Sequence, residues 1–128
     1  MQCYKYKIGY LRGKVLEHDG KLQEVLDMYT ESLSYLPTHY KLSKSIGRTQ
    51  RLLGNHSQSI KIFEDLIKGV PLSGERNLEL AKSYYADKNR NKALEYLEIV
   101  LNVWENADAT FKPAIEAREK WVEWNQSN

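Results

Sequence analysis

Apolar residues recur every three to four positions along much of the chain, a spacing that predicts amphipathic helices. Residues at these spacings fall on one face of a helix, so each stripe predicts a helix that buries one side. Three such stripes stand out: Leu22, Val25, Leu26, Tyr29 and Leu33; Ile60, Phe63, Ile67 and Val70; and Ala93, Leu97, Val100 and Trp104.

The sequence also repeats itself with a period of 34 residues. Fixed self-similarity of this length is typical of a solenoid built from one supersecondary unit. The repeated pairs are Gly13 with Gly47, Gly20 with Gly54, Tyr29 with Phe63, and Pro37 with Pro71; the same offset leads from Gly47 and Ser59 to Ala81 and Ala93.

The two glycines of each unit have different predicted roles. Gly20 and Gly54 stand just before a predicted helix, where a left-handed residue ends the preceding helix at little cost. Gly13 and Gly47, and the corresponding Ala81, lie inside predicted helices. A glycine there costs about 1 kcal/mol relative to alanine, so we expect the missing side chain to permit close approach of a neighbouring helix.

These residues resemble the pattern of the tetratricopeptide repeat, a unit of two helices. That pattern has a small residue in the first helix, a small residue and then an aromatic one in the second, and a closing proline. The matching residues are Gly13, Val25, Tyr29 and Pro37; Gly47, Ser59, Phe63 and Pro71; and Ala81, Tyr84, Ala93 and Leu97. Glu105 replaces the third proline, and Arg12 and Gln50 also depart from the pattern. A related helical repeat is the alternative.

The resemblance implies an all-α fold, a right-handed α-solenoid in a single domain spanning residues 1–128. Its three helix-turn-helix repeats would cover about 6–39, 40–73 and 74–107. A C-terminal capping helix at about 110–125 would cover the last apolar surface, with Ala114, Ala117, Trp121 and Trp124 as its packing stripe. The N-terminal edge is rich in tyrosine; it either packs within the first repeat or meets a second copy or preceding sequence.

Composition narrows the class of protein. With 128 residues, 41% apolar and 28% charged, the chain suits one globular domain, and no apolar run reaches the roughly 20 residues that span a bilayer. Cys3 is the only cysteine, which excludes an internal disulfide and favours a reducing compartment such as the cytoplasm. The histidines lack metal-ligand spacing and no phosphate-binding loop occurs. We therefore expect neither enzyme activity, nor a metal, nor a cofactor.

The distribution of charge is more informative than the net charge of +2. The first helices of the first two units carry balances of +3 and +4. In tetratricopeptide proteins the first helices line a concave groove, so the resemblance implies a basic groove that binds an acidic protein or peptide segment, extended or helical. The candidate groove residues are Lys7, Tyr10, Lys14, Lys41, Lys44, Arg48, Arg51, Lys82 and Tyr85. A merely solvated lysine-rich face is the structural alternative.

Three other functions are weighed against this scaffold role. Single-stranded nucleic acid could follow the same basic row with tyrosines stacking on bases, but the small net charge and the acids Glu75 and Glu79 disfavour it. A chaperone-tail clamp is disfavoured because these two acids stand where that clamp has cations. A self-associating module, a homodimer through the tyrosine-rich N-terminal edge, is the third.

Overall fold

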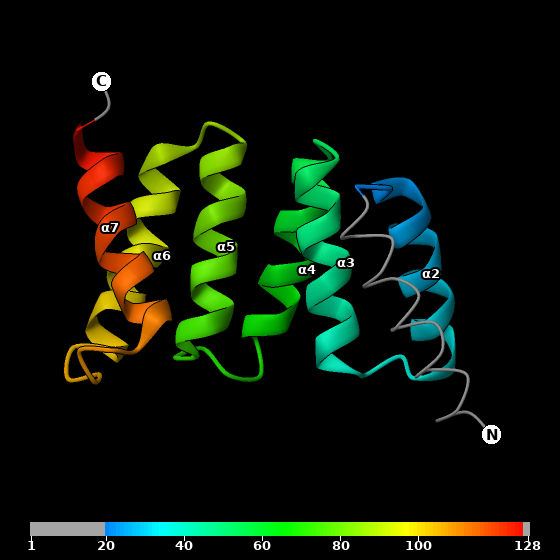
Figure 1. Ribbon diagram of the computed structural model, residues 1–128, viewed down its shortest axis with the longest axis horizontal. Helices are drawn as coiled ribbons and strands as arrows, with labels where there is room; N and C mark the ends of the chain where they lie inside the picture. Colours follow the sequence, from blue (N-terminus) through cyan, green and yellow to red (C-terminus); the bar gives the residue numbers. More distant parts are fainter. Residues whose placement is uncertain (1–19, 127–128) are drawn as a thin grey trace. The chain divides into compact units, whose positions relative to one another are not determined.

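The computed structural model describes residues 20–126. Within these residues every regular element is a helix (Figure 1), so the all-α prediction is confirmed. The elements are α2 (Leu22–Tyr35), α3 (Tyr40–Leu52), α4 (His56–Ile67), α5 (Gly74–Ala86), α6 (Arg90–Val103) and α7 (Lys112–Gln126). The predicted roles of Gly13 and of the N-terminal tyrosines fall outside the described residues.

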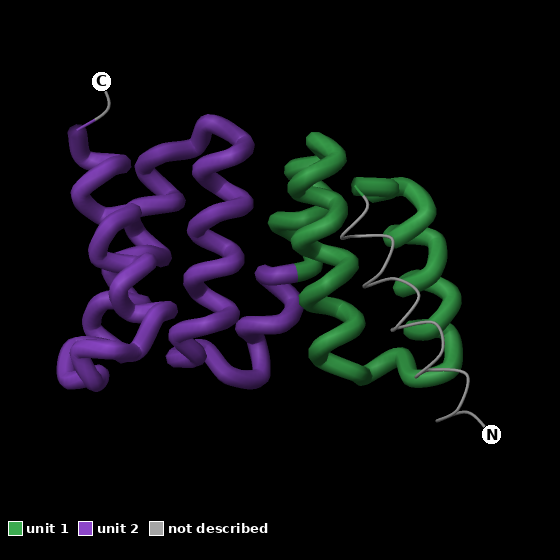
Figure 2. Tube along the Cα trace, viewed as in Figure 1, with its two compact units in different colours: residues 1–62 green, residues 63–128 purple. Residues whose placement is uncertain are grey.

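The chain divides into two compact units, residues 1–62 and 63–128, with the boundary inside α4 (Figure 2). In the first unit α2 packs against α3. Val25 and Tyr29 of α2 and Leu42 and Ile46 of α3 form its buried cluster. Two members of the first predicted stripe, Val25 and Tyr29, are fully buried, which confirms the buried face of that helix.

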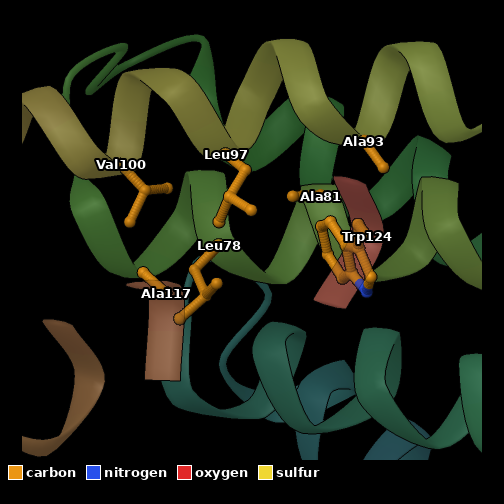
Figure 3. Packing of buried hydrophobic residues seen from close by; sticks show 7 residues of the cluster. All are labelled: Leu78, Ala81, Ala93, Leu97, Val100, Ala117 and Trp124. Atoms are coloured by element: carbon orange, nitrogen blue, oxygen red, sulfur yellow. The ribbon is translucent and has the colours of Figure 1, made fainter. Parts of the chain in front are cut away.

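In the second unit α6 packs against both α5 and α7. Figure 3 shows Leu97 and Val100 of α6 pointing toward Leu78 of α5. Small side chains at the centre of these helices keep their backbones close. The buried cluster consists of Leu78, Ala81, Ala93, Leu97, Val100, Ala117 and Trp124, and Trp121 packs against it. The predicted packing role of the two α7 tryptophans is therefore confirmed.

The turns that follow α3 and α5 have the same hydrogen bonds, displaced by one repeat. In each, three successive backbone N–H groups donate back to the last turn of the preceding helix, as in a Schellman-type end. The donors and acceptors are Leu53 to Thr49, Gly54 to Arg51 and Asn55 to Gln50, and then Asp87 to Ser83, Lys88 to Tyr85 and Asn89 to Tyr84. The repeat visible in the sequence is thus also a repeat of backbone geometry.

Left-handed backbone occurs once in each of the three turns that precede α2, α4 and α6. Gly20 has φ 75° and Gly54 has φ 87°, as predicted. The third turn carries Lys88 at the corresponding position, with φ 64°. A residue with a Cβ atom pays a steric cost in this conformation, so the third turn retains the geometry without the glycine.

The predicted stripe of α4 is wrong at its last member. Val70 lies beyond the end of the helix at Ile67 and is 40% exposed. Pro71 disfavours helical backbone at the residue before it, and the N–H of Val70 donates to the Ile67 carbonyl in a turn. The helical spacing therefore continues one turn further in the sequence than in the structure.

Polar side chains fix the connection between α4 and α5. The Asn77 amide donates to the carbonyl oxygens of Pro71 and Ser73, at 2.9 and 2.8 Å. The Arg76 guanidinium donates to the Leu66 carbonyl at 2.8 Å. Ser73 caps α5 by accepting from the backbone N–H of Arg76 at 3.3 Å. The bond to Leu66 satisfies a carbonyl group at the end of α4 that the helix itself leaves without a partner.

We predict that Lys88→Gly stabilises the protein. Left-handed backbone costs a non-glycine residue roughly 1–2 kcal/mol, and the greater freedom of glycine in the unfolded chain returns roughly 0.5–1 kcal/mol. The expected net gain in free energy of unfolding is about 0.5–1 kcal/mol. Urea denaturation followed by circular dichroism measures it. Lys92→Gly is the matched control, because this exposed lysine lies inside α6; it should lose about 0.5–1 kcal/mol.

We also predict that Gly74→Ala destabilises the second unit. An alanine Cβ at this position would lie 2.5 Å from Cζ2 of the Trp104 indole and would clash with further ring atoms. Overpacking of this kind costs about 1–3 kcal/mol. Gly69→Ala is the control, since nothing lies within 4 Å of its added Cβ. In a Trp104→Leu background the Gly74→Ala cost should shrink; an unchanged cost would show that the indole is not the obstacle.

Candidate functional site

The candidate site in the first unit is built on α3. Its buried side carries Leu42 and Ile46, and a buried hydrogen bond from the Thr49 hydroxyl to the Ser45 carbonyl, 2.7 Å long, lies on the same side. Ser59 of α4 donates to the Gly47 carbonyl at 2.7 Å. This bond joins α4 to the α3 backbone. These contacts fix which face of α3 points away from the core.

The cations of α3 occupy that outward side. Lys41, Lys44, Arg48 and Arg51 follow the spacing i, i+3, i+7, i+10, which places them on one helix face, and α3 contains no acid. Lys41 is exposed and the other three are half-buried. The Lys44 ammonium lies 5.7 Å from the centre of the Tyr40 ring, a cation–π distance. Like charges at these spacings repel one another, so this face favours an anionic neighbour.

The predicted site residues of the second unit lie in a different environment. The Lys82 ammonium pairs with the Glu116 carboxylate of α7 at 2.5 Å and with Glu79 at 3.8 Å. Only 22% of the Lys82 side chain is exposed. The Tyr85 ring stacks on Trp124 with ring centres 4.4 Å apart. Both residues therefore join α5 to α7.

The predicted site residues are distributed over both units. Four predicted cations share one face of α3, whereas Lys82 and Tyr85 lie on α5 in the other unit. Lys7, Tyr10 and Lys14 lie outside the described residues. Sequence reasoning missed Glu116 as the partner of Lys82. The charge balance of a single helix does not include acids of other helices. No local pattern predicts a contact between Lys82 and a residue 34 positions away.

Two ionisable groups have shifted pKa values. Burial, together with the nearby carboxylate of Glu64 to which its hydroxyl is hydrogen-bonded, raises the pKa of Tyr84 to about 12. Its ring also stacks on Tyr96 at 5.6 Å. Hydrogen bonds from the Thr110 hydroxyl and N–H lower the pKa of the Asp108 carboxyl. Both shifts move the pKa further from neutral pH, and neither group lies on the basic face of α3.

The described part of the chain includes a shallow hollow in each unit. One, of about 500 Å³, lies in the first unit and is lined by Gln50, Ser57, Gln58, Lys61 and Ile62. The other, of about 440 Å³, lies on α7 and is lined by Arg118, Glu119, Val122, Glu123 and Gln126. Neither contains a candidate groove residue.

Residues 20–126 present neither a metal site nor a membrane-spanning helix. No group of three or more His, Cys, Asp or Glu side chains there is arranged to hold a metal ion. No helix of that segment combines the length and apolarity needed to cross a membrane.

Comparison with known proteins identifies the repeat. The family model described as tetratricopeptide repeat matches residues 78–107, which run from α5 through α6 into the following turn. A search of curated proteins finds no match.

Solved structures share the fold at low sequence identity. The TPR2B domain of yeast Sti1, in a complex with pHsp70, superposes with a TM-score of 0.82 at 18% identity, covering 98% of this chain and 99% of that one. The first TPR of Spaghetti (RPAP3), bound to the HSP90 peptide SRMEEVD, superposes with a TM-score of 0.77 at 17% identity, covering 96% of this chain and 92% of that one. PcrH in complex with the chaperone-binding region of PopD superposes with a TM-score of 0.78 at 11% identity, covering 93% of this chain and 90% of that one.

The match at 78–107 and the superpositions agree with the duplicated turn geometry and with the buried small residues of α5 and α6. They confirm the predicted helical-repeat fold of the α-solenoid class. Residues 78–107 thus match one tetratricopeptide repeat, and the chain shares the fold of tetratricopeptide-repeat domains.

Proposed function

We propose that this chain is a protein-interaction module whose basic α3 face binds an acidic segment of a partner protein. The observation that carries the proposal is the set of four cations on one face of a helix that contains no acid. The buried contacts of the opposite face hold α3 in place, so the cations are presented by a fixed element. Fixed cations lose less side-chain and backbone freedom on binding than a mobile loop would.

The second unit contributes differently to this proposal. Lys82 is engaged by Glu116 and Glu79, and Glu75 is exposed on the same helix. The carboxylates of an acidic ligand would compete there with those already bound to Lys82. Because α3 itself contains no acid, we assign the main electrostatic contribution to Lys41, Lys44, Arg48 and Arg51.

The similar structures support a peptide ligand. Three of them are described with a bound peptide, protein or binding region from HSP90, pHsp70 and PopD. The HSP90 peptide SRMEEVD itself carries two glutamates and an aspartate. At 11–18% identity these proteins support the mode of binding and not the partner.

The proposed ligand is an internal acidic segment, extended or helical, and not a free chain terminus. A terminal carboxylate clamp needs cations where this chain has Glu75 and Glu79. Glu79 is buried and close to Lys82, so it adds negative charge where a carboxylate would have to bind. The proposal assigns no catalytic activity to the chain, and it places the interaction in the cytoplasm because of the single cysteine.

Reversal of two α3 charges tests the proposal. Short fluorescent peptides rich in Asp and Glu should bind the wild-type chain, and Lys44→Glu with Arg48→Glu should weaken binding about tenfold or more, which corresponds to roughly 1.4 kcal/mol. Fluorescence anisotropy measures the affinity. The control carries the same charge change at the exposed Lys61 and Lys112 and should bind like wild type.

Three results would contradict the proposal. If the α3 variant and the control lost the same affinity, net charge alone would explain the binding. If the α3 variant bound like wild type, α3 would not belong to the interface. Single-stranded oligonucleotides bound in preference to the acidic peptides, with a steep loss of affinity as salt rises, would instead favour nucleic acid as the ligand.

A further inference from the structure

Lys82 of α5 and Glu116 of α7 stand 34 residues apart, at equivalent positions of the repeat. The Lys82 ammonium lies 2.5 Å from the Glu116 carboxylate and 3.8 Å from the carboxylate of Glu79, which is on its own helix. One cation and two carboxylates give this group of three residues a formal charge of −1. An acidic ligand therefore meets no net positive charge at Lys82, although the repeat pattern assigns this lysine to ligand binding.

The packing of α7 fixes Glu116 in this place. Ala114 and Ala117, which stand on either side of it in the sequence, are buried. Ala117 and Trp124 belong to the buried cluster of the second unit (Figure 3), and the Trp124 ring stacks on Tyr85 of α5 with ring centres 4.4 Å apart. The Glu116 carboxylate is therefore presented to α5 by a docked helix.

A carboxylate of the same molecule competes strongly with a carboxylate of a ligand. Even a short flexible link gives an attached group an effective concentration of millimolar order, and Glu116 is held by a packed helix. A ligand at micromolar concentration is about a thousandfold more dilute. A second carboxylate at the same lysine is also repelled by the first, since like charges a few ångströms apart disfavour each other. Glu116 thus occupies Lys82 ahead of an acidic ligand.

The ion pair contributes little to the docking of α7. The side chains of Lys82 and Glu116 are 22% and 40% exposed, and ion pairs that reach the solvent add little to stability. The buried residues Ala114, Ala117 and Trp124 supply the packing instead. Loss of the Glu116 charge should therefore leave α7 docked and make the Lys82 ammonium accessible to a ligand.

We propose that Glu116 determines which ligands α5 accepts, because its carboxylate occupies Lys82 in place of a ligand carboxylate. The inference deepens the proposed function and rests on its premise that the chain binds acidic segments. Glu116 keeps such segments from α5, while the cations of α3 remain the main basic face. Residue 116 is then a specificity-determining position, at which the loss of one negative charge adds a binding cation. The role of α7 extends from covering the core to limiting the surface that acidic ligands can use.

Removal of the Glu116 charge tests the inference. Glu116→Gln keeps the size of the side chain and should raise the affinity for the fluorescent Asp- and Glu-rich peptides about fivefold, the order expected when one unit charge a few ångströms from a ligand carboxylate is removed. Fluorescence anisotropy measures the affinity. Glu119→Gln is the matched control, because it removes the same charge from an exposed residue of the same helix, and it should bind nearly like wild type.

A second background tests whether Lys82 is the residue released. In a Lys82→Gln chain, Glu116→Gln should change the affinity no more than Glu119→Gln does, because the cation that the ligand would use is gone. On addition of peptide, the backbone amide resonances of residues 80–85 should shift in the Glu116→Gln chain and stay in place in wild type, as a two-dimensional NMR titration measures.

The fold of each variant is checked by circular dichroism and urea unfolding. Glu116→Ala, which has a high helix propensity, should give the same gain in affinity as Glu116→Gln, so the result does not depend on the folding of one variant.

Two results would overturn the inference. Equal affinities of the Glu116→Gln and Glu119→Gln chains would show that Glu116 does not withhold Lys82 from ligands. A gain in affinity that persists in the Lys82→Gln chain would assign the effect of Glu116 to net charge alone.

The same measurements keep this inference separate from the proposed function. If Lys44→Glu with Arg48→Glu binds like wild type while Glu116→Gln gains affinity through Lys82, the α3 face is not the site and the role of Glu116 stands. If the α3 variant loses affinity and Glu116→Gln behaves like its control, the proposed function stands and the role of Glu116 is overturned. Absence of peptide binding both by wild type and by Glu116→Gln would remove both.

Discussion

Close approach of paired helices is the constraint on which the rest of this structure depends. In α5 and α6 that approach is made by Ala81 and Ala93, both fully buried. Between α3 and α4, the Gly47 carbonyl accepts a hydrogen bond from the Ser59 hydroxyl. Larger residues at these positions would separate the backbones and leave gaps in a close-packed interior. In α5 and α6 these small residues stand at positions of the 34-residue period.

Each helix of such a pair buries one face against the core and points the opposite face outward. On α3 the committed face carries apolar and small residues, and the other carries four cations. On α2 the buried Val25 and Tyr29 stand opposite three acids. Charge on the outer face scarcely alters the fold, because exposed charges contribute little to stability. The repeat can therefore keep its architecture while its outer faces take on different partners.

The sequence was sufficient for those features that local spacing determines. Gly20 and Gly54 were predicted to be left-handed, and they are; Ala114, Ala117 and Trp124 were predicted to pack, and they do. The stripe failed at Val70, where the restriction from the following proline outweighed a continuing apolar period. Local pattern also did not predict the backbone of Lys88, which is left-handed at a position where the repeat would predict glycine.

The candidate site was less predictable, because the environment of a charge is a tertiary property. Arg48 and Lys82 are equivalent in the repeat, and their sequence neighbours gave no reason to separate them. Yet α7 supplies Glu116 to Lys82, so an acid from the capping helix neutralises a cation that the repeat register had assigned to ligand binding. The last repeat of a solenoid differs from the inner ones in this respect, since its exposed side must be covered by a helix outside the pattern. Such a helix brings its own charges. In this chain α7 both covers the apolar core of α5 and α6 and pairs Glu116 with Lys82. One packing event therefore buries the core and engages the cation.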